Sequence, residues 1–131
     1  MRHEDRFKDE RAKIEHALDE LERAAARIEA GDAPDAQVAQ TVATLTDTEE
    51  AAYDDSEVSE GEPVLSVCVA EHEAARVLLR KLKSALDARE RGDIAAGRLF
   101  AQNARDYSRL RREHMKRDDR LFAKVPGGAQ A

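Results

Sequence analysis

Apolar residues recur every three or four positions along four segments of this chain, which is the spacing of one face of an α-helix. The predicted helices span about residues 2–30, 34–53, 63–91 and 94–124. Gly31 ends the first helix, Pro34 opens the second, Pro63 opens the third, and Gly92 separates the third from the fourth. Short connections at the first and third junctions imply antiparallel neighbours. The pattern therefore predicts an all-α fold, an antiparallel up-down-up-down four-helix bundle.

The core-facing stripes contain polar residues where apolar ones are expected. The third helix shows this clearly, because its stripe reads Leu65, Cys68, His72, Ala75, Leu79, Leu82, Leu86. Arg11 interrupts the first stripe, Glu49 the second and His114 the fourth in the same way. Buried polar groups are unfavourable unless they are paired or bind a metal. We therefore expect one charged layer across the bundle, and this layer is the candidate site.

Charge is unevenly distributed along the 131 residues. Residues 31–63 contain ten acidic residues and no Lys or Arg, whereas residues 64–131 are basic, with a net charge of +6. An acidic partner such as nucleic acid would suit the basic half. However, both signs interleave there and aromatic residues are scarce, so we expect the acidic second helix to pack beside the basic third and fourth helices, and no nucleic-acid binding.

Other sequence features bear on the location of the protein. No apolar run approaches the roughly 20 residues that a membrane span needs. The first ten residues are mostly charged, unlike a secretory signal, and the single cysteine, Cys68, excludes an internal disulfide. A cytoplasmic protein without a membrane association is expected. The acidic segment 54–62 is expected to be a loop.

The fourth helix carries the most specific motif, in which His114 is followed by Arg117, Asp118, Asp119 and then by Leu121 and Phe122. Together with the pair Glu71 and His72, this motif resembles the hemerythrin-like family, or HHE cation-binding domains, whose corresponding pattern is His, then Lys-Glu-Asp, then Leu-Phe. The resemblance covers nearly the whole chain. It implies a domain over residues 1–124, followed by a disordered tail over 125–131.

The resemblance also implies a function and a set of metal ligands. Family members are four-helix bundles that hold two iron ions and serve in oxygen binding, iron storage or sensing, and repair of iron centres. On this match the ligands here are His72, His114 and Asp119, with Asp118 as the alternative acid and Glu49 or Glu50 from the second helix. Imidazole and carboxylate ligands suit iron, manganese or zinc.

This chain departs from the family pattern at three positions. The first helix has Arg11 where the family has His, and no His occurs in the second helix. Cys68 stands where oxygen-carrying members have another His. Arginine cannot release its proton to bind a metal, and its charge repels one. We therefore expect a reduced site, with one or two iron or other divalent ions, in metal, redox or oxygen sensing.

The sequence is also consistent with two alternative functions. In a metal-free relative, Arg11 forms a buried salt-bridge layer with Asp119 and Glu49 or Glu50, and the protein acts as a structural or binding module for a small ligand or protein partner. A weaker alternative is enzymatic, with peroxide or nitric-oxide chemistry at a residual iron or redox sensing through Cys68. His3 and His16 are expected on the surface.

Overall fold

The computed structural model describes the backbone of residues 3–57 and 63–124, and the side chains of residues 9, 11–50 and 70–117. This part of the chain folds into four α-helices and contains no strand. The helices are α1 (His3–Glu29), α2 (Ala36–Glu57), α3 (Pro63–Glu90) and α4 (Ala95–Lys124). The predicted all-α class with four helices is confirmed. The predicted tail, residues 125–131, lies outside the described residues.

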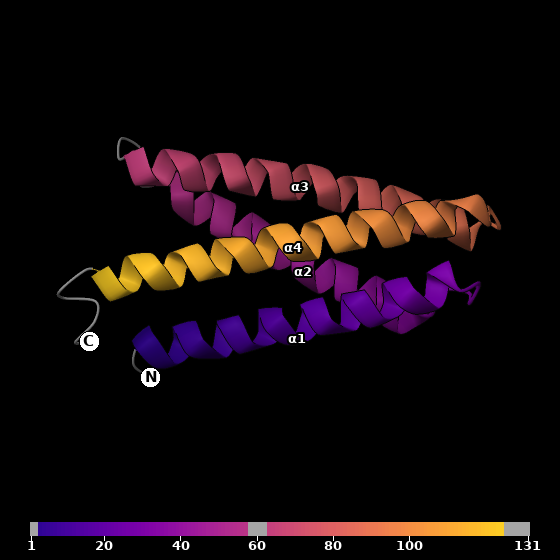
Figure 1. Cartoon of the computed structure of the whole chain (residues 1–131), viewed down its shortest axis with the longest axis horizontal. Coiled ribbons are helices and arrows are strands. Elements are labelled where there is room, and N and C mark those ends of the chain that lie inside the picture. Colours follow the sequence, from indigo (N-terminus) through magenta and orange to yellow (C-terminus); the bar gives the residue numbers. More distant parts are fainter. Residues whose placement is uncertain (1–2, 58–62, 125–131) are drawn as a thin grey trace.

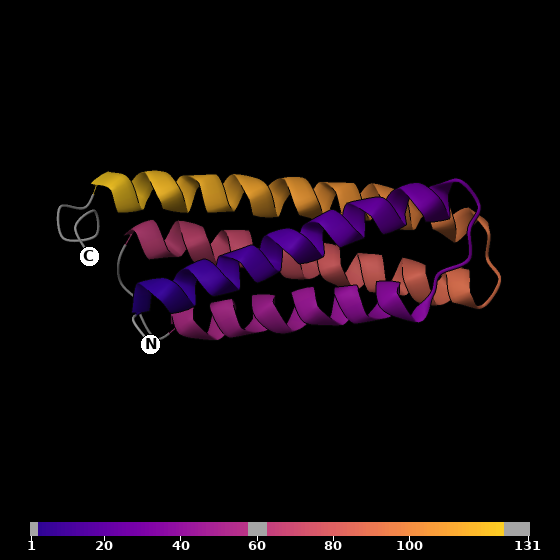
Figure 2. The same ribbon diagram turned by 90° about the horizontal axis from the view of Figure 1, so that it is seen from below.

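The helices lie side by side along one direction and form a bundle (Figures 1 and 2). α4 packs against α1 and α3, and α2 packs against the same two helices from the other side. α2 and α4 are therefore diagonal to each other across the core, and so are α1 and α3. The turns between α1 and α2 and between α3 and α4 lie at the same end of the bundle (Figure 1).

The helix ends follow from a few residues. Gly31 and Gly92 have φ angles of 112° and 102°, in the left-handed region that favours glycine. The amides of Asp32 and Asp93 then donate to the carbonyls of Arg27 and Ala88, both at 3.0 Å. These are the hydrogen bonds of the Schellman motif, which stops a helix and satisfies its last carbonyl groups.

α2 differs from its predicted bounds at both ends. It begins at residue 36 because the Asp35 carboxylate caps it, accepting a hydrogen bond of 3.0 Å from the Val38 amide. It continues to Glu57, so the predicted loop over 54–62 is wrong for its first four residues. The segment 54–57 contains no Gly or Pro that would stop a helix.

The core consists of the predicted apolar stripes, and most of their described residues turn inward. Each helix contributes residues that are fully or almost fully buried: Leu18, Leu21, Ala25 and Ile28 from α1, Val38, Val42 and Leu45 from α2, Leu79, Leu82 and Leu86 from α3, and Phe100 and Tyr107 from α4. At about 1.5–3 kcal/mol for each buried aliphatic side chain, this core can tolerate a layer of polar groups.

The charged outer faces pair across neighbouring helices. Arg105 and Arg112 of α4 contact Glu29 and Asp19 of α1, at 2.9 and 2.7 Å. The predicted packing of the acidic second helix beside α4 is therefore wrong, because α2 contacts α1 and α3, and these outer arginines of α4 pair with acids of α1. Within the part of the chain that the structure describes, no helix is long and apolar enough to cross a membrane.

Candidate functional site

A charged group occupies the core where the stripe of α2 ends. Glu49 follows Val42 and Leu45 on the inner face of α2, and only 1% of its surface is exposed. Its Oε2 lies 3.4 Å from Nδ1 of His72 on α3 and 3.3 Å from Nη1 of Arg111 on α4. The contact with Arg111 crosses the core, because α2 and α4 are diagonal to each other.

The geometry of these contacts makes Glu49 an ion-pair partner more than a hydrogen-bond acceptor. Both separations lie within salt-bridge range, yet Oε2 accepts no hydrogen bond from the described residues. The carboxylate is held by charge in a region where water is excluded, which strengthens its attraction to Arg111. An ion pair of this kind is stabilising only while both partners remain in place.

A second group lies next to the first and has the same composition. Nδ1 of His114 on α4 contacts Oε2 of Glu71 on α3, and the guanidinium of Arg117 contacts Oε1 of the same carboxylate. His114 is 8% exposed. Each of the two groups therefore consists of one imidazole, one carboxylate and one guanidinium, drawn from more than one helix.

The two imidazoles join the groups into one layer. The ring centroids of His72 and His114 are 5.2 Å apart, and the ring planes are inclined by 58°. A cavity of about 10 Å³, with room for about one water molecule, lies among these side chains. Its lining residues are Glu49, Glu71, His72, Ala75, Leu110, Arg111 and His114. Three of the four residues predicted to share one level of the core, Glu49, His72 and His114, lie together, whereas the fourth, Arg11, is not among the residues that line this cavity.

Tyr107 lies one turn before Arg111 on the same face of α4, and the charges of this layer affect the pKa of its phenol. It is 1% exposed, and burial raises the pKa of its phenol well above the usual value. The negative charge of Glu49 raises this pKa further, while the positive charge of Arg111 lowers it. The phenol is therefore neutral in the folded protein at any ordinary pH.

Arg11 and Glu50 stand outside this layer. The Arg11 side chain is 26% exposed, and its Nε lies 3.5 Å from Glu15 on its own helix. Glu50 pairs with Arg76 of α3 at 2.8 Å and is 46% exposed. Because α1 contributes its buried apolar residues from Ile14 onward, Arg11 lies at the margin of the described core.

Sequence reasoning missed Arg111 and did not assign Glu71 a place in the site. On α4, Arg111 is buried and Leu110 is only partly buried. Tyr107, Arg111 and His114 are spaced by four and three, so the signal was present in the helical period. Arginines are mostly exposed, which is why composition alone does not point to Arg111.

The remaining predicted residues can be placed only in part. Asp118, Asp119 and Cys68 lie on α4 and α3, but their side chains, like that of His3, are outside the described residues. His16 is exposed, as predicted.

The described side chains do not by themselves fit a metal ion. Among them, no group of three or more His, Cys, Asp or Glu residues could hold one. Glu49 and Glu71 each face a guanidinium, so the negative charge that a cation would need is already balanced.

Comparisons with known proteins identify no relative of this chain. No family model matches the chain, and neither a curated protein nor a solved structure matches it.

Proposed function

We propose that this chain is a metal-independent relative of the hemerythrin-like bundles and serves as a structural or binding module. The observation that supports this best is the pairing of the buried carboxylate of Glu49 with the guanidinium of Arg111. Arg117 does the same for Glu71. The two guanidinium groups therefore balance the two carboxylates of this layer. A divalent ion would add two uncompensated positive charges to a region of low dielectric constant, which is strongly unfavourable.

In this proposal Arg111 has the role that the sequence suggested for Arg11. The layer would fix the register of the helices, since sliding α2 along α4 would leave the charges of Glu49 and Arg111 buried and separated. We also infer that the bundle has the antiparallel up-down-up-down order. Its support is that the α1–α2 and α3–α4 turns lie at the same end of the bundle (Figure 1).

A second candidate function, cation binding at a reduced iron site, is supported by a different observation. His72 and His114 each have a carboxylate against Nδ1. Metal-bound histidines commonly donate this ring N–H to a carboxylate, which orients the other nitrogen, Nε2, toward the ion. In this case His72 and His114 would hold one ion together with Asp119, or with Asp118 as the alternative acid. The ion would supply metal, redox or oxygen sensing.

The metal content of the protein separates the two functions. Protein from iron-rich growth, purified without oxygen, is measured by elemental analysis and by its visible absorption spectrum. The metal-independent proposal expects less than about 0.1 iron per chain and no change in melting temperature when Fe²⁺ is added. About one iron per chain that is lost in His114→Ala and kept in His16→Ala would overturn it in favour of cation binding.

A further inference from the structure

Three large apolar side chains are exposed along the second half of α3, the following turn and the start of α4. They are Val77, Ile94 and Leu99, with exposed fractions of 39%, 75% and 52%. Leu99 lines the groove between the two helices, Val77 lies on α3 one turn before Lys81, and Ile94 lies in the turn into α4.

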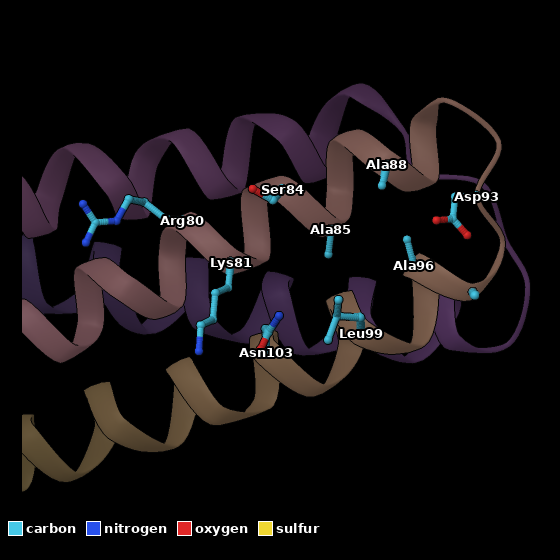
Figure 3. Close-up of a pocket in the computed structure, with 10 residues that line it drawn as sticks. Arg80, Lys81, Ser84, Ala85, Ala88, Asp93, Ala96, Leu99 and Asn103 are labelled. Carbon is cyan, nitrogen blue, oxygen red and sulfur yellow. The ribbon is translucent and has the colours of Figure 1, made fainter.

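The groove has a volume of about 730 Å³ and lies between the second half of α3 and the first half of α4 (Figure 3). The middle of the groove is apolar and is formed by Ala85 and Ala88 of α3 and by Ala96 and Leu99 of α4. These side chains are mostly small, so the two helix backbones are accessible to close packing. Nothing in the described chain covers the groove.

The two ends of the groove carry opposite charges. Arg80 and Lys81 lie at one end, and Asp93 lies in the turn at the other end (Figure 3). None of these three side chains forms an ion pair with a described residue, whereas Arg76, Arg105, Arg111 and Arg112 on the same two helices do. The charges beside the groove are therefore available to a partner.

We propose that this groove is the contact surface of a symmetric dimer, and that its occupant is a second copy of the same chain. A two-fold axis through the middle of the groove brings each end against the opposite end of the second copy. Lys81 and Arg80 then meet Asp93 of the second copy, Val77 approaches Ile94, and Leu99 packs near the axis. A two-fold dimer requires a surface that is complementary to the same surface of the second copy in this way.

Asn103 lines the groove at its basic end. In the dimer its amide faces the end of the second copy that carries Asp93, whose carboxylate can accept a hydrogen bond from it.

The length of the surface suits a dimer of moderate affinity. From Lys81 to Ala88 the groove runs about 10 Å along α3, which is two turns of helix. Stable dimers bury about 800 Å² on each partner, and the flanking Val77 and Ile94 must contribute to reach this area. A dissociation constant on the order of micromolar is expected.

The test is the molar mass of the full chain in solution, measured by light scattering or sedimentation from about 1 µM to about 500 µM. The proposal expects a reversible monomer–dimer equilibrium. Leu99→Glu weakens the dimer at least about tenfold because it buries a charge at the axis. Lys83→Glu, at an exposed position of α3 outside the groove, leaves the equilibrium unchanged. Circular dichroism checks that each variant is folded.

A charge exchange tests the two-fold arrangement itself. Lys81→Glu and Asp93→Lys each weaken the dimer, because like charges then meet. The two substitutions in one chain restore it, because opposite charges meet again with their signs exchanged. A monomer at every concentration would overturn the proposal, since the groove would then serve another partner or none. The proposal would also be overturned if Leu99→Glu left the dissociation constant unchanged. The same holds if the double variant Lys81→Glu with Asp93→Lys did not restore the dimer.

Discussion

Arg111 of α4 reaches Glu49 of α2 across the diagonal of the bundle, with Nη1 and Oε2 3.3 Å apart. The two side chains are 9% and 1% exposed, so this is a buried ion pair between helices that do not otherwise pack against each other. The low dielectric constant of the core makes the attraction between the two charges strong. For the same reason, removing one partner leaves a buried unpaired charge, which is strongly destabilising.

Removing one member of the pair should destabilise the protein strongly. Glu49→Gln leaves the guanidinium of Arg111 buried without a full negative charge, and we expect a loss of about 3 kcal/mol in the free energy of unfolding. Urea denaturation at neutral pH measures it. Glu50→Gln is the matched control, because that carboxylate is 46% exposed, and it should lose less than about 1 kcal/mol.

The double variant Glu49→Leu with Arg111→Met removes both charges and should recover most of the stability lost in Glu49→Gln. If the stability lost in the double variant equalled the sum of the losses measured separately for Glu49→Leu and Arg111→Met, the two charges would not be coupled.

Arg11 should matter much less than Arg111, although both interrupt a helical stripe. The Arg11 side chain is 26% exposed against 9% for Arg111, so solvent screens its ion pair with Glu15 far more. We expect Arg11→Ala to lower the free energy of unfolding by less than about 1 kcal/mol, and Arg111→Ala by about 3 kcal/mol. Parallel urea titrations of the two variants decide this, and equal losses would place Arg11 within the charged layer.

Tyr107 should make the protein less stable at alkaline pH. Its pKa is raised in the folded state by burial and by Glu49, so the unfolded state loses the phenolic proton first. Stability is therefore unaffected below about pH 10, the usual pKa of tyrosine, and falls as the pH rises beyond it. The melting temperature should fall less steeply above this pH in Tyr107→Phe than in the parent chain. Identical slopes would show that other groups govern the alkaline transition.

Gly92 should be needed for its backbone conformation. Its φ of 102° is one that side chains with a Cβ rarely adopt, although no atom lies within 4 Å of where that Cβ would be. Gly92→Ala should therefore lower stability by about 1 kcal/mol through backbone strain alone. Thermal unfolding measures it, with Lys83→Ala at an exposed position of α3 outside the groove as a control that should change little.

The local pattern of the sequence was sufficient for the helices and for much of the layer. The three-and-four spacing of Leu18, Leu21, Leu79 and Leu82 determines which face of each helix is buried, because an apolar stripe has only the core to face. The same spacing identified Glu49, His72 and His114 as buried. These conclusions depend on contacts within one helix and its own period, which the sequence contains in full.

The partners of the buried charges were decided by the tertiary structure. Whether Glu49 meets an arginine from α1 or from α4 depends on which helices are diagonal and on a small rotation of α4, less than the roughly 100° between successive residues. That rotation places Arg111 in the core and Leu110 toward its edge, while Tyr107 and His114 stay buried. Helical periodicity tolerates such a shift, whereas packing of four helices selects one arrangement, because it must bury the apolar residues and pair the charges at the same time.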